Sequence, residues 1–141
     1  MTSRSLIRLA RPDDIAELLA LWHHAPGGLV VRPDTEEALQ ALLAHTKDAI
    51  LIAELDSETV GAVIAAWDGW RGNIYRLAVR AEYRRQGLGR RLIEAAEMRL
   101  RAKGARRVTA LVAKDDRAAT GIWEAAGYRY EEPTARFVRN L

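Results

Sequence analysis

The sequence predicts a mixed α/β fold: one sheet with helices on both faces, in the order β-α-α-β-β-β-α-β-α-β-β. The first observation behind this prediction is that apolar residues switch between strand-like and helix-like spacing along the chain. The second is that strand-like runs return between the helical ones, as in proteins whose helices cover both faces of a sheet. The third is composition: 141 residues, 49% hydrophobic and 29% charged, suit a single globular domain over residues 1–141.

The first third of the chain is expected to form one strand and two helices. Residues 5–10 suit a strand, and Pro12 suits the first turn of the helix that follows. A loop over residues 23–33 leads to the second helix, for which Asp34 and Glu37 predict a capping box. Each helix has one apolar face: Ile15, Leu18, Leu19 and Trp22 on the first, and Leu39, Leu42 and Leu43 on the second.

The middle of the chain is expected to supply three strands. Residues 49–55 and 60–67 are two apolar runs separated by a short polar turn, which predicts a hairpin. After a second turn, residues 73–79 form another strand-like run. A long helix over residues 87–103 should follow, with one buried face formed by Leu88, Leu92, Ile93, Ala96 and Leu100.

The last third is expected to continue the sheet. Gly104 should cap the long helix, and residues 108–113 are apolar on both faces, which predicts a central strand. A short helix should then begin at the Asp115-Asp116 pair and end at Gly127. Two final strands are expected on either side of Pro133, over residues 128–131 and 135–140.

Composition narrows the class of protein. The net charge is +3, too small an excess to indicate nucleic-acid binding by itself, and the basic residues cluster between positions 84 and 91. The absence of cysteine excludes disulfides, thiolate metal sites and a cysteine nucleophile. No apolar run approaches the roughly 18 residues needed to span a bilayer, and the N-terminus lacks the apolar core of a signal peptide. We therefore expect a cytoplasmic protein with no membrane partner.

The candidate site is a basic turn between the strand at 73–79 and the long helix. We call residues 84–89 the glycine turn; they read Arg84-Arg85-Gln86-Gly87-Leu88-Gly89. The first N–H groups of a helix have no internal acceptor and carry partial positive charge, so they bind phosphate well. Glycines let a phosphate approach the backbone, and arginines supply charged donors. The turn is not a dinucleotide G-x-G-x-x-G, because Leu92 replaces the third glycine, nor a P-loop, which needs G-K-[ST].

Two motifs together resemble the GNAT superfamily of acyl-CoA-dependent N-acetyltransferases. The glycine turn matches the first family signature, [RQ]-x-x-G-x-[GA]. The stretch from Asp116 through Trp123 to Gly127-Tyr128 is similar to the second, N-x-x-A-x-x-x-Y-x-x-x-G-[FY]. The spacing within and between the motifs agrees, and the resemblance covers essentially the whole chain. It is strongest to small stand-alone members of the YpeA-like branch.

The resemblance implies acetyl-CoA as co-substrate, no metal, and direct attack of an amine on the thioester. Main-chain groups of the strand would pair with the pantetheine arm, and the glycine turn would bind the pyrophosphate. The coenzyme-binding residues expected on this basis are Leu77, Ala78, Val79, Arg84, Arg85, Gln86, Gly87, Leu88, Gly89, Arg90, Asp116 and Trp123.

The sequence departs from the family pattern at three positions. Trp123 stands where many members have a tyrosine that protonates the departing thiolate, and an indole N–H is not a practical acid. Asp116 replaces the usual asparagine and keeps the capping function while losing the amide donor. Asn73 stands where some relatives have a glutamate base, so Tyr75, on the same face of the strand, becomes the candidate proton carrier. His23, His24 and Asp68 are further candidates, and for each a non-catalytic role in a loop or turn is the simpler reading.

These observations favour an enzyme that moves an acetyl group from acetyl-CoA to a primary amine. A non-catalytic acyl-CoA-binding module is the alternative, motivated by Trp123 and Asn73. Nucleic-acid binding is disfavoured by the modest charge and by the lack of aromatic residues beside the arginine cluster. The acceptor stays open between a small-molecule and a peptide amine, and the assembly between a monomer and a homodimer.

Overall fold

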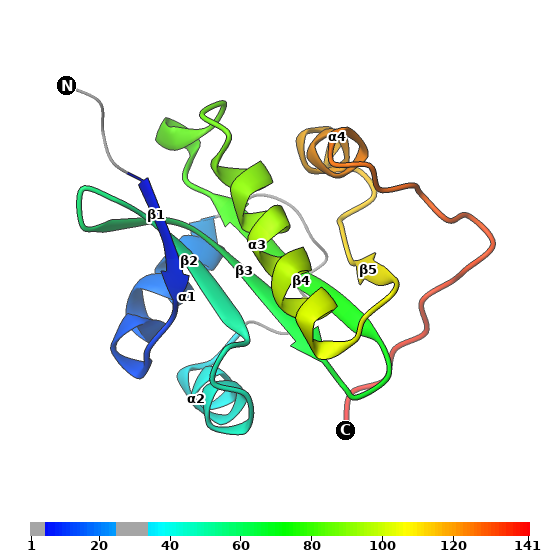
Figure 1. The fold of residues 1–141 in the computed structure, drawn as a ribbon, viewed down its shortest axis with the longest axis horizontal. Helices are drawn as coiled ribbons and strands as arrows, with labels where there is room; N and C mark the ends of the chain where they lie inside the picture. Colours follow the sequence, from blue (N-terminus) through cyan, green and yellow to red (C-terminus); the bar gives the residue numbers. More distant parts are fainter. Residues whose placement is uncertain (1–4, 25–33) are drawn as a thin grey trace.

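The computed structural model describes residues 5–24 and 34–141 (Figure 1). Within these ranges the chain forms five strands, four α-helices and two short 3-10 turns. The strands are β1 (Ser5–Leu9), β2 (Ile50–Leu55), β3 (Glu58–Trp67), β4 (Gly72–Val79) and β5 (Val108–Ala110). The helices are α1 (Ile15–His24), α2 (Glu36–His45), α3 (Leu88–Lys103) and α4 (Arg117–Ala125), and the turns are η1 (Pro12–Asp14) and η2 (Ala81–Tyr83).

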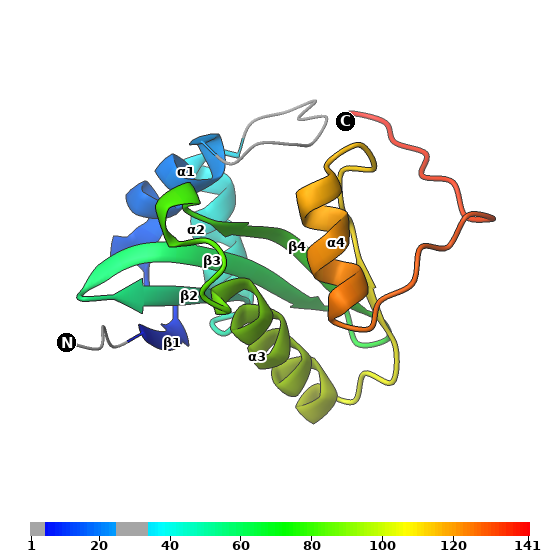
Figure 2. The same cartoon turned by 90° about the horizontal axis from the view of Figure 1, so that it is seen from above.

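The five strands form one mixed sheet in the order β1-β2-β3-β4-β5. The first four are antiparallel neighbours, and only β5 runs parallel to its partner, β4. Helices α1 and α2 cover one face, while α3 covers the other, with α4 beside it (Figure 2). The mixed sheet with helices on both faces is therefore confirmed.

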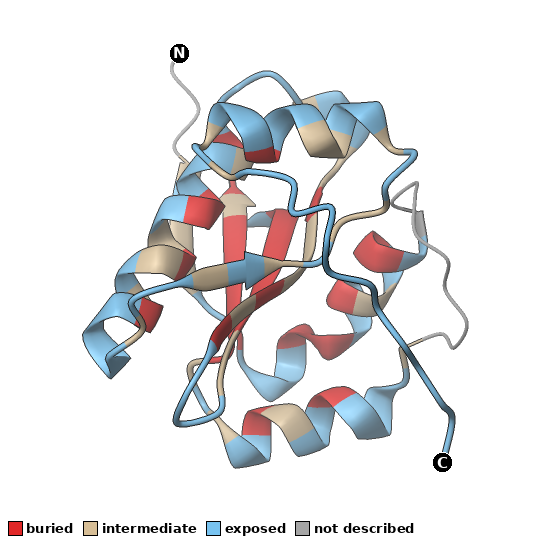
Figure 3. Ribbon diagram, turned by 90° about the vertical axis from the view of Figure 1, so that its right-hand side faces the viewer, coloured by how far each residue is buried: buried red, intermediate tan, exposed pale blue. Residues whose placement is uncertain are grey.

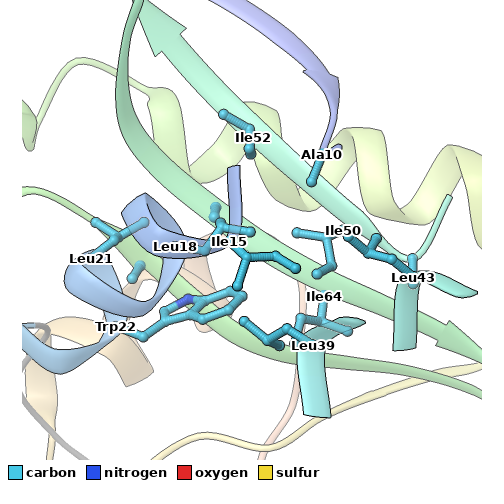
Figure 4. Close-up of a cluster of buried hydrophobic side chains, with 13 residues drawn as sticks. Ala10, Ile15, Leu18, Leu21, Trp22, Leu39, Leu43, Ile50, Ile52 and Ile64 are labelled. Carbon is cyan, nitrogen blue, oxygen red and sulfur yellow. The ribbon is translucent and has the colours of Figure 1, made fainter. Parts of the chain in front are cut away.

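Each face of the sheet has its own apolar core. The first lies between the sheet and the two N-terminal helices and includes Ile15, Leu18, Trp22, Leu39, Leu43, Ile50, Ile52 and Ile64 (Figure 4). The second lies under α3 and α4 and includes Leu51, Val63, Ile74, Leu88, Leu92, Ile93, Leu100 and Trp123. The apolar helix faces expected from the sequence are the ones that these cores bury. The sheet is thereby fixed between two packed layers, which holds β4 in place next to the candidate site.

The ends of α3 follow the sequence prediction, whereas the start of α2 does not. Gly87 and Gly104 cap α3 at φ +80° and +116°, in the left-handed region that glycine tolerates best. For α2 the capping side chain is Thr35, whose Oγ1 accepts the N–H of Ala38 at 3.1 Å. The capping role predicted for Asp34 is wrong, because that carboxylate lies one residue too early and pairs with Arg76 instead.

The strands predicted for the C-terminal third are wrong in place and extent, whereas the predicted short helix is present as α4. Strand β5 ends at Ala110 and lies at the edge of the sheet, so residues 108–113 do not form a central strand. Residues 128–131 and 135–140 form no strands and are largely exposed (Figure 3). Between these two stretches lies a turn at Pro133, where the N–H and Oγ1 of Thr134 both donate to Glu131. Phe137, 93% exposed, has no packing partner that would hold it in a sheet.

Among the described residues, no helix combines the length and the apolar character that crossing a bilayer would require.

Candidate active site

A β-bulge interrupts β4 halfway along its length. Ala62 of β3 faces Ala78, but Ile64 faces Tyr75, so β4 carries one more residue than β3 between these pairs. The extra residue adopts a left-handed backbone, since Arg76 has φ +60°. The bulge shifts the alternation of the strand: Tyr75 and Ala78 pack on the first core, while Leu77 and Val79 pack on the second. A bulge of this kind re-aims the backbone that follows it.

Beyond the bulge, β4 loses its partner on one side. Pairing with β5 ends where Leu111 donates to the Ile74 carbonyl at 3.3 Å, and the two strands then separate (Figure 1). On the other side Arg80 still donates to the Val60 carbonyl of β3 at 2.8 Å. The backbone N–H and C=O groups of successive strand residues point to opposite sides of the strand. The N–H and C=O of Val79 therefore point away from β3. We call residues 77–79 the open edge of β4; it can pair with an extended ligand.

The glycine turn follows directly and leads into α3. Arg85 has φ +63° and Gly87 has φ +80°, so two nearby residues of the turn are left-handed. The N–H of Arg91 is the first that bonds within the helix, to the Gly87 carbonyl at 3.1 Å. The N–H groups of residues 88–90 precede it and have no acceptor inside the helix. Leu88 anchors the turn, because its side chain is buried in the second core. The result is a fixed loop with free donors at a helix N-terminus, as an anion site requires.

Gly89 leaves space that the fold does not need. A Cβ built at this position would lie 3.9 Å from Val79 and Ile122, which is ordinary contact. Its backbone is not left-handed either, unlike that of Gly87. Neither packing nor backbone conformation therefore demands glycine here. Room for a ligand against the first turn of α3 is the remaining physical reason for a glycine.

The second motif forms α4 and its ends. Asp116 caps the helix as expected, with Oδ1 accepting the N–H of Ala119 at 3.0 Å. Trp123 is buried in the second core, and its ring meets that of Tyr128 edge-on at 4.8 Å. The Tyr128 hydroxyl donates to Glu97 at 2.7 Å, and burial raises the pKa of this phenol well above its usual value. The motif therefore fastens α4 to the core beside the glycine turn.

Helix α4 is also tied to the first turn of α3, directly after the glycine turn, through Arg90. Its Nη1 donates to the Ala125 carbonyl at the end of α4, at 3.0 Å. By contrast, the side chain of Arg85 is exposed, and the described part of the chain offers it no hydrogen bond or ion pair. Arg84 donates through Nε to the Val79 carbonyl at 3.2 Å, which links the turn to the open edge. The turn and the open edge are thus one connected unit.

The comparisons with known proteins agree with this geometry. The model of the acetyltransferase (GNAT) family matches residues 13–128, which span both motifs and four of the five strands, β2 to β5. The chain belongs to this family. A curated acetyltransferase of Yersinia pestis (strain Pestoides F) is 33% identical over 128 residues, covering 89% of each chain. As a member of the GNAT family, the protein is an acyltransferase.

Solved structures show the same fold. Ard1 from Thermoplasma volcanium superposes with a TM-score of 0.76 at 19% identity, over 87% of this chain and 81% of that one. The aminoglycoside N-acetyltransferase AAC(6')-Iy, in complex with the bisubstrate analogue CoA-S-monomethyl-acetylneamine, superposes with a TM-score of 0.76 at 17% identity. This likeness covers 99% of this chain and all of that one. At such identities the likeness establishes the GNAT fold.

The residues considered for proton transfer fall in three different places. Asn73 and Tyr75 are half-buried on β4 before the bulge, and Tyr75 packs against the first core. His23 and His24 belong to the last turn of α1, so the predicted loop does not begin at residue 23. The rest of that predicted loop, residues 25–33, lies outside the described residues. Asp68 accepts the N–H groups of Trp70 and Arg71 at 2.7 and 2.6 Å, and these bonds lower the pKa of its carboxyl. Asp68 thus shapes the β3–β4 turn.

Tyr83 lies next to the glycine turn, at the end of η2. The negative charge of Glu58 raises the pKa of this phenol, so it is a weaker acid than a free tyrosine. Sequence reasoning missed a different residue of this region, Arg76. The one signal available was a charged side chain in the middle of the apolar strand Asn73 to Val79.

Proposed function

We propose that the protein transfers an acetyl group from acetyl-CoA directly to a primary amine, carried by a small molecule or a peptide. The observation that carries the proposal is the continuity of two features: the open edge of β4 leads straight into the glycine turn. An extended arm bearing an anionic group needs that combination, because strand groups pair with the arm while helix N–H groups bind the charge. Coenzyme A has this chemistry, with a pantetheine arm and a pyrophosphate.

Each part of the coenzyme is assigned to a different set of residues. Main-chain groups of Leu77, Ala78 and Val79 pair with the pantetheine arm. The N–H groups from Arg85 to Arg90 surround the pyrophosphate, and Gly87 and Gly89 let it approach the backbone. The exposed guanidinium of Arg85 adds a charged donor. Asp116 contributes by holding α4 in place through its cap, and Trp123 contributes to the same wall from inside the core.

The chemistry is one acyl transfer. The lone pair of the neutral amine attacks the thioester carbonyl carbon, and the carbonyl electrons move onto oxygen. The Leu77 N–H stabilises that oxyanion. The C–N bond is kept as the oxyanion collapses, the C–S bond breaks, and the electron pair leaves on sulfur. The proton lost by nitrogen ends on the thiolate or in water, giving an amide and CoA.

The thiolate leaves without help from the position that Trp123 occupies. Its indole is buried and is not an acid in water. The thiolate of a thiol with an ordinary pKa is a fair leaving group near neutral pH. The departure of CoA therefore does not need a strong acid. The amine proton leaves through water, with Tyr75 as a proton carrier whose phenol oxygen accepts a proton as its own proton passes on. Asn73, on the same face of β4, orients that water.

Calorimetric titration of acetyl-CoA tests the binding step. Wild type and Gly89→Glu are compared, with Ala102→Glu as the matched control, since it adds the same charge at an exposed position near the other end of α3. We expect wild type and control to bind with micromolar affinity and Gly89→Glu to lose binding. If all three fold and none binds, the proposal is wrong.

Release of free thiol with a panel of amines tests the transfer step. We expect at least one primary amine to raise thiol release above the hydrolysis blank. Binding without release for any amine would instead indicate an acyl-CoA-binding module.

A further inference from the structure

Arg76 carries a strained backbone that its neighbours must hold. It is the extra residue of the β4 bulge, with φ +60°. For a residue with a Cβ, this conformation costs about 1–2 kcal/mol. Such residues persist where the surrounding structure over-determines them, and they cluster at functional sites. The question is therefore which groups hold Arg76, and what their hold does to the backbone next to it.

The first group is the indole of Trp22. Its Nε1 donates to the Arg76 carbonyl at 2.7 Å, from α1 to β4. Trp22 is only 8% exposed and belongs to the first core, where Figure 4 shows its ring among the side chains of α1 and α2. A buried N–H left without an acceptor costs about 1–3 kcal/mol. Because the core holds the Trp22 ring in place, the hydrogen bond from Nε1 fixes the position of the Arg76 carbonyl.

The second group is the carboxylate of Asp34. The guanidinium of Arg76 meets it at two points, Nε to Oδ2 and Nη2 to Oδ1, both at 3.2 Å. Two parallel contacts fix the orientation of the planar guanidinium as well as its position. Asp34 immediately precedes Thr35, the cap of α2. Arg76 is thus held by the last turn of α1 through its main chain and by the start of α2 through its side chain.

The hold on Arg76 sets the direction of the next N–H. The carbonyl of Arg76 and the N–H of Leu77 belong to one planar trans peptide, in which they point in opposite directions. A carbonyl held against Trp22 therefore turns the Leu77 N–H away from α1. A hydrogen bond received by the carbonyl also polarises the peptide and makes its N–H a stronger donor.

We propose that Trp22 and Asp34 are positioning residues that aim the Leu77 N–H at the thioester carbonyl of acetyl-CoA. The inference rests on the proposed function, which assigns the oxyanion contact to Leu77. It adds that this contact is built from α1 and α2, on the opposite face of the sheet from the glycine turn. Coenzyme binding and activation of the acetyl group are then separable, since within the described residues no hydrogen bond or ion pair joins the glycine turn to Trp22 or Asp34.

The test compares two ligands on labelled protein. Amide chemical shifts of wild type are recorded with CoA and with acetyl-CoA, and the difference at Leu77 reports contact with the acetyl carbonyl. We expect Trp22→Phe to reduce this difference at least twofold while the Kd for CoA changes less than twofold. Asp34→Asn should give a smaller reduction. Leu18→Val, which thins the same core without touching Arg76, is the control and should keep the wild-type difference.

Kinetics give an independent readout. With an accepted amine, Trp22→Phe should lower kcat about tenfold, since a misaimed oxyanion donor loses part of the hundredfold or more that such a donor supplies. The KM for acetyl-CoA should stay within twofold. A merely structural role would lower kcat in Leu18→Val as well.

The outcomes separate the inference from the proposed function. If wild type binds acetyl-CoA and both variants keep the full shift difference at Leu77, the positioning role is wrong and the proposed function stands. If wild type binds neither ligand, the proposed function fails and the inference with it. Should Trp22→Phe not fold, Asp34→Asn still decides, because its ion pair is about one-third exposed and lies outside the core.

Discussion

In the described part of the chain, two arginines have left-handed backbones, and their surroundings differ. Arg76, in the bulge of β4, is held by an indole donor on its carbonyl and a carboxylate on its guanidinium. Arg85, in the glycine turn, has a similar φ of +63° but an exposed side chain to which the described residues offer no bond. The strain at Arg76 is balanced within the protein, whereas at Arg85 it is not. The bulge is therefore preorganised by the protein itself, and the proposed function predicts that the Arg85 guanidinium gains a partner only when an anion binds.

The largest effect is expected at Gly61, which packs against the part of β4 between Arg76 and Arg85. Gly61 of β3 faces Val79, and a Cβ there would lie 3.0 Å from the Ala78 carbonyl oxygen and 3.2 Å from Leu92. Since one obstacle is backbone, we expect Gly61→Ala to lower the free energy of unfolding by about 1–3 kcal/mol. Urea denaturation measures it. In the control, Gly121→Ala, nothing lies within 4 Å, and a gain of about 0.5–1 kcal/mol is expected. Equal denaturation midpoints for the two variants would contradict this prediction, because β3 and β4 would then accommodate a Cβ at position 61 without loss of stability.

The second prediction exchanges each strained arginine for glycine. Arg85→Gly removes about 1–2 kcal/mol of left-handed strain and adds back about 0.5–1 kcal/mol of chain entropy. We therefore expect a net gain between zero and about 1.5 kcal/mol in the free energy of unfolding. Arg76→Gly relieves the same strain but also loses the two-point ion pair with Asp34. That loss, of up to about 1 kcal/mol, offsets most of the gain. Arg85→Gly should thus be the more stable variant by about 1 kcal/mol in urea denaturation. The reverse order would mean that Arg85 is held by the fold as Arg76 is.

The same contrast explains what the sequence could and could not predict. The glycine turn was predictable because its causes are local: glycine tolerates φ +80°, and a helix N-terminus supplies free N–H groups wherever it occurs. The bulge was not, because its partners are distant in the chain. Trp22 and Asp34 precede Arg76 by 54 and 42 positions, and no local pattern announces them. Asp34 was misassigned as a helix cap for that reason.

The prediction of two C-terminal strands was wrong for a related reason. Whether residues 128–131 and 135–140 form strands depends on pairing with an edge, and short alternating runs do not specify a partner. The cap at Asp116 and the end of the helix at Gly127, whose φ is +94°, were predicted correctly, because each depends on a few adjacent residues. The two apolar cores were predictable from helix periodicity, since burial of one face follows from spacing alone.

The smallest effect is expected at Arg90, an arginine near the glycine turn that bonds with the rest of the fold. Its Nη1 bonds the Ala125 carbonyl at 3.0 Å and its Nε lies 3.5 Å from Glu94, with more than half of both side chains exposed. Arg90→Gln removes both contacts, and Glu94→Gln, the matched control, removes only the ion pair. An exposed i,i+4 pair contributes about 0.3–0.5 kcal/mol, and salt screens it.

We expect Glu94→Gln to lose that amount in urea denaturation at low salt and nothing at high salt. Arg90→Gln should lose a few tenths of a kcal/mol more at both salt concentrations, because the bond to a carbonyl at the end of α4 is less sensitive to screening. If the two variants coincide at every salt concentration, Arg90 does not link α3 to α4. It would then resemble Arg85, as a donor that the fold leaves for the ligand.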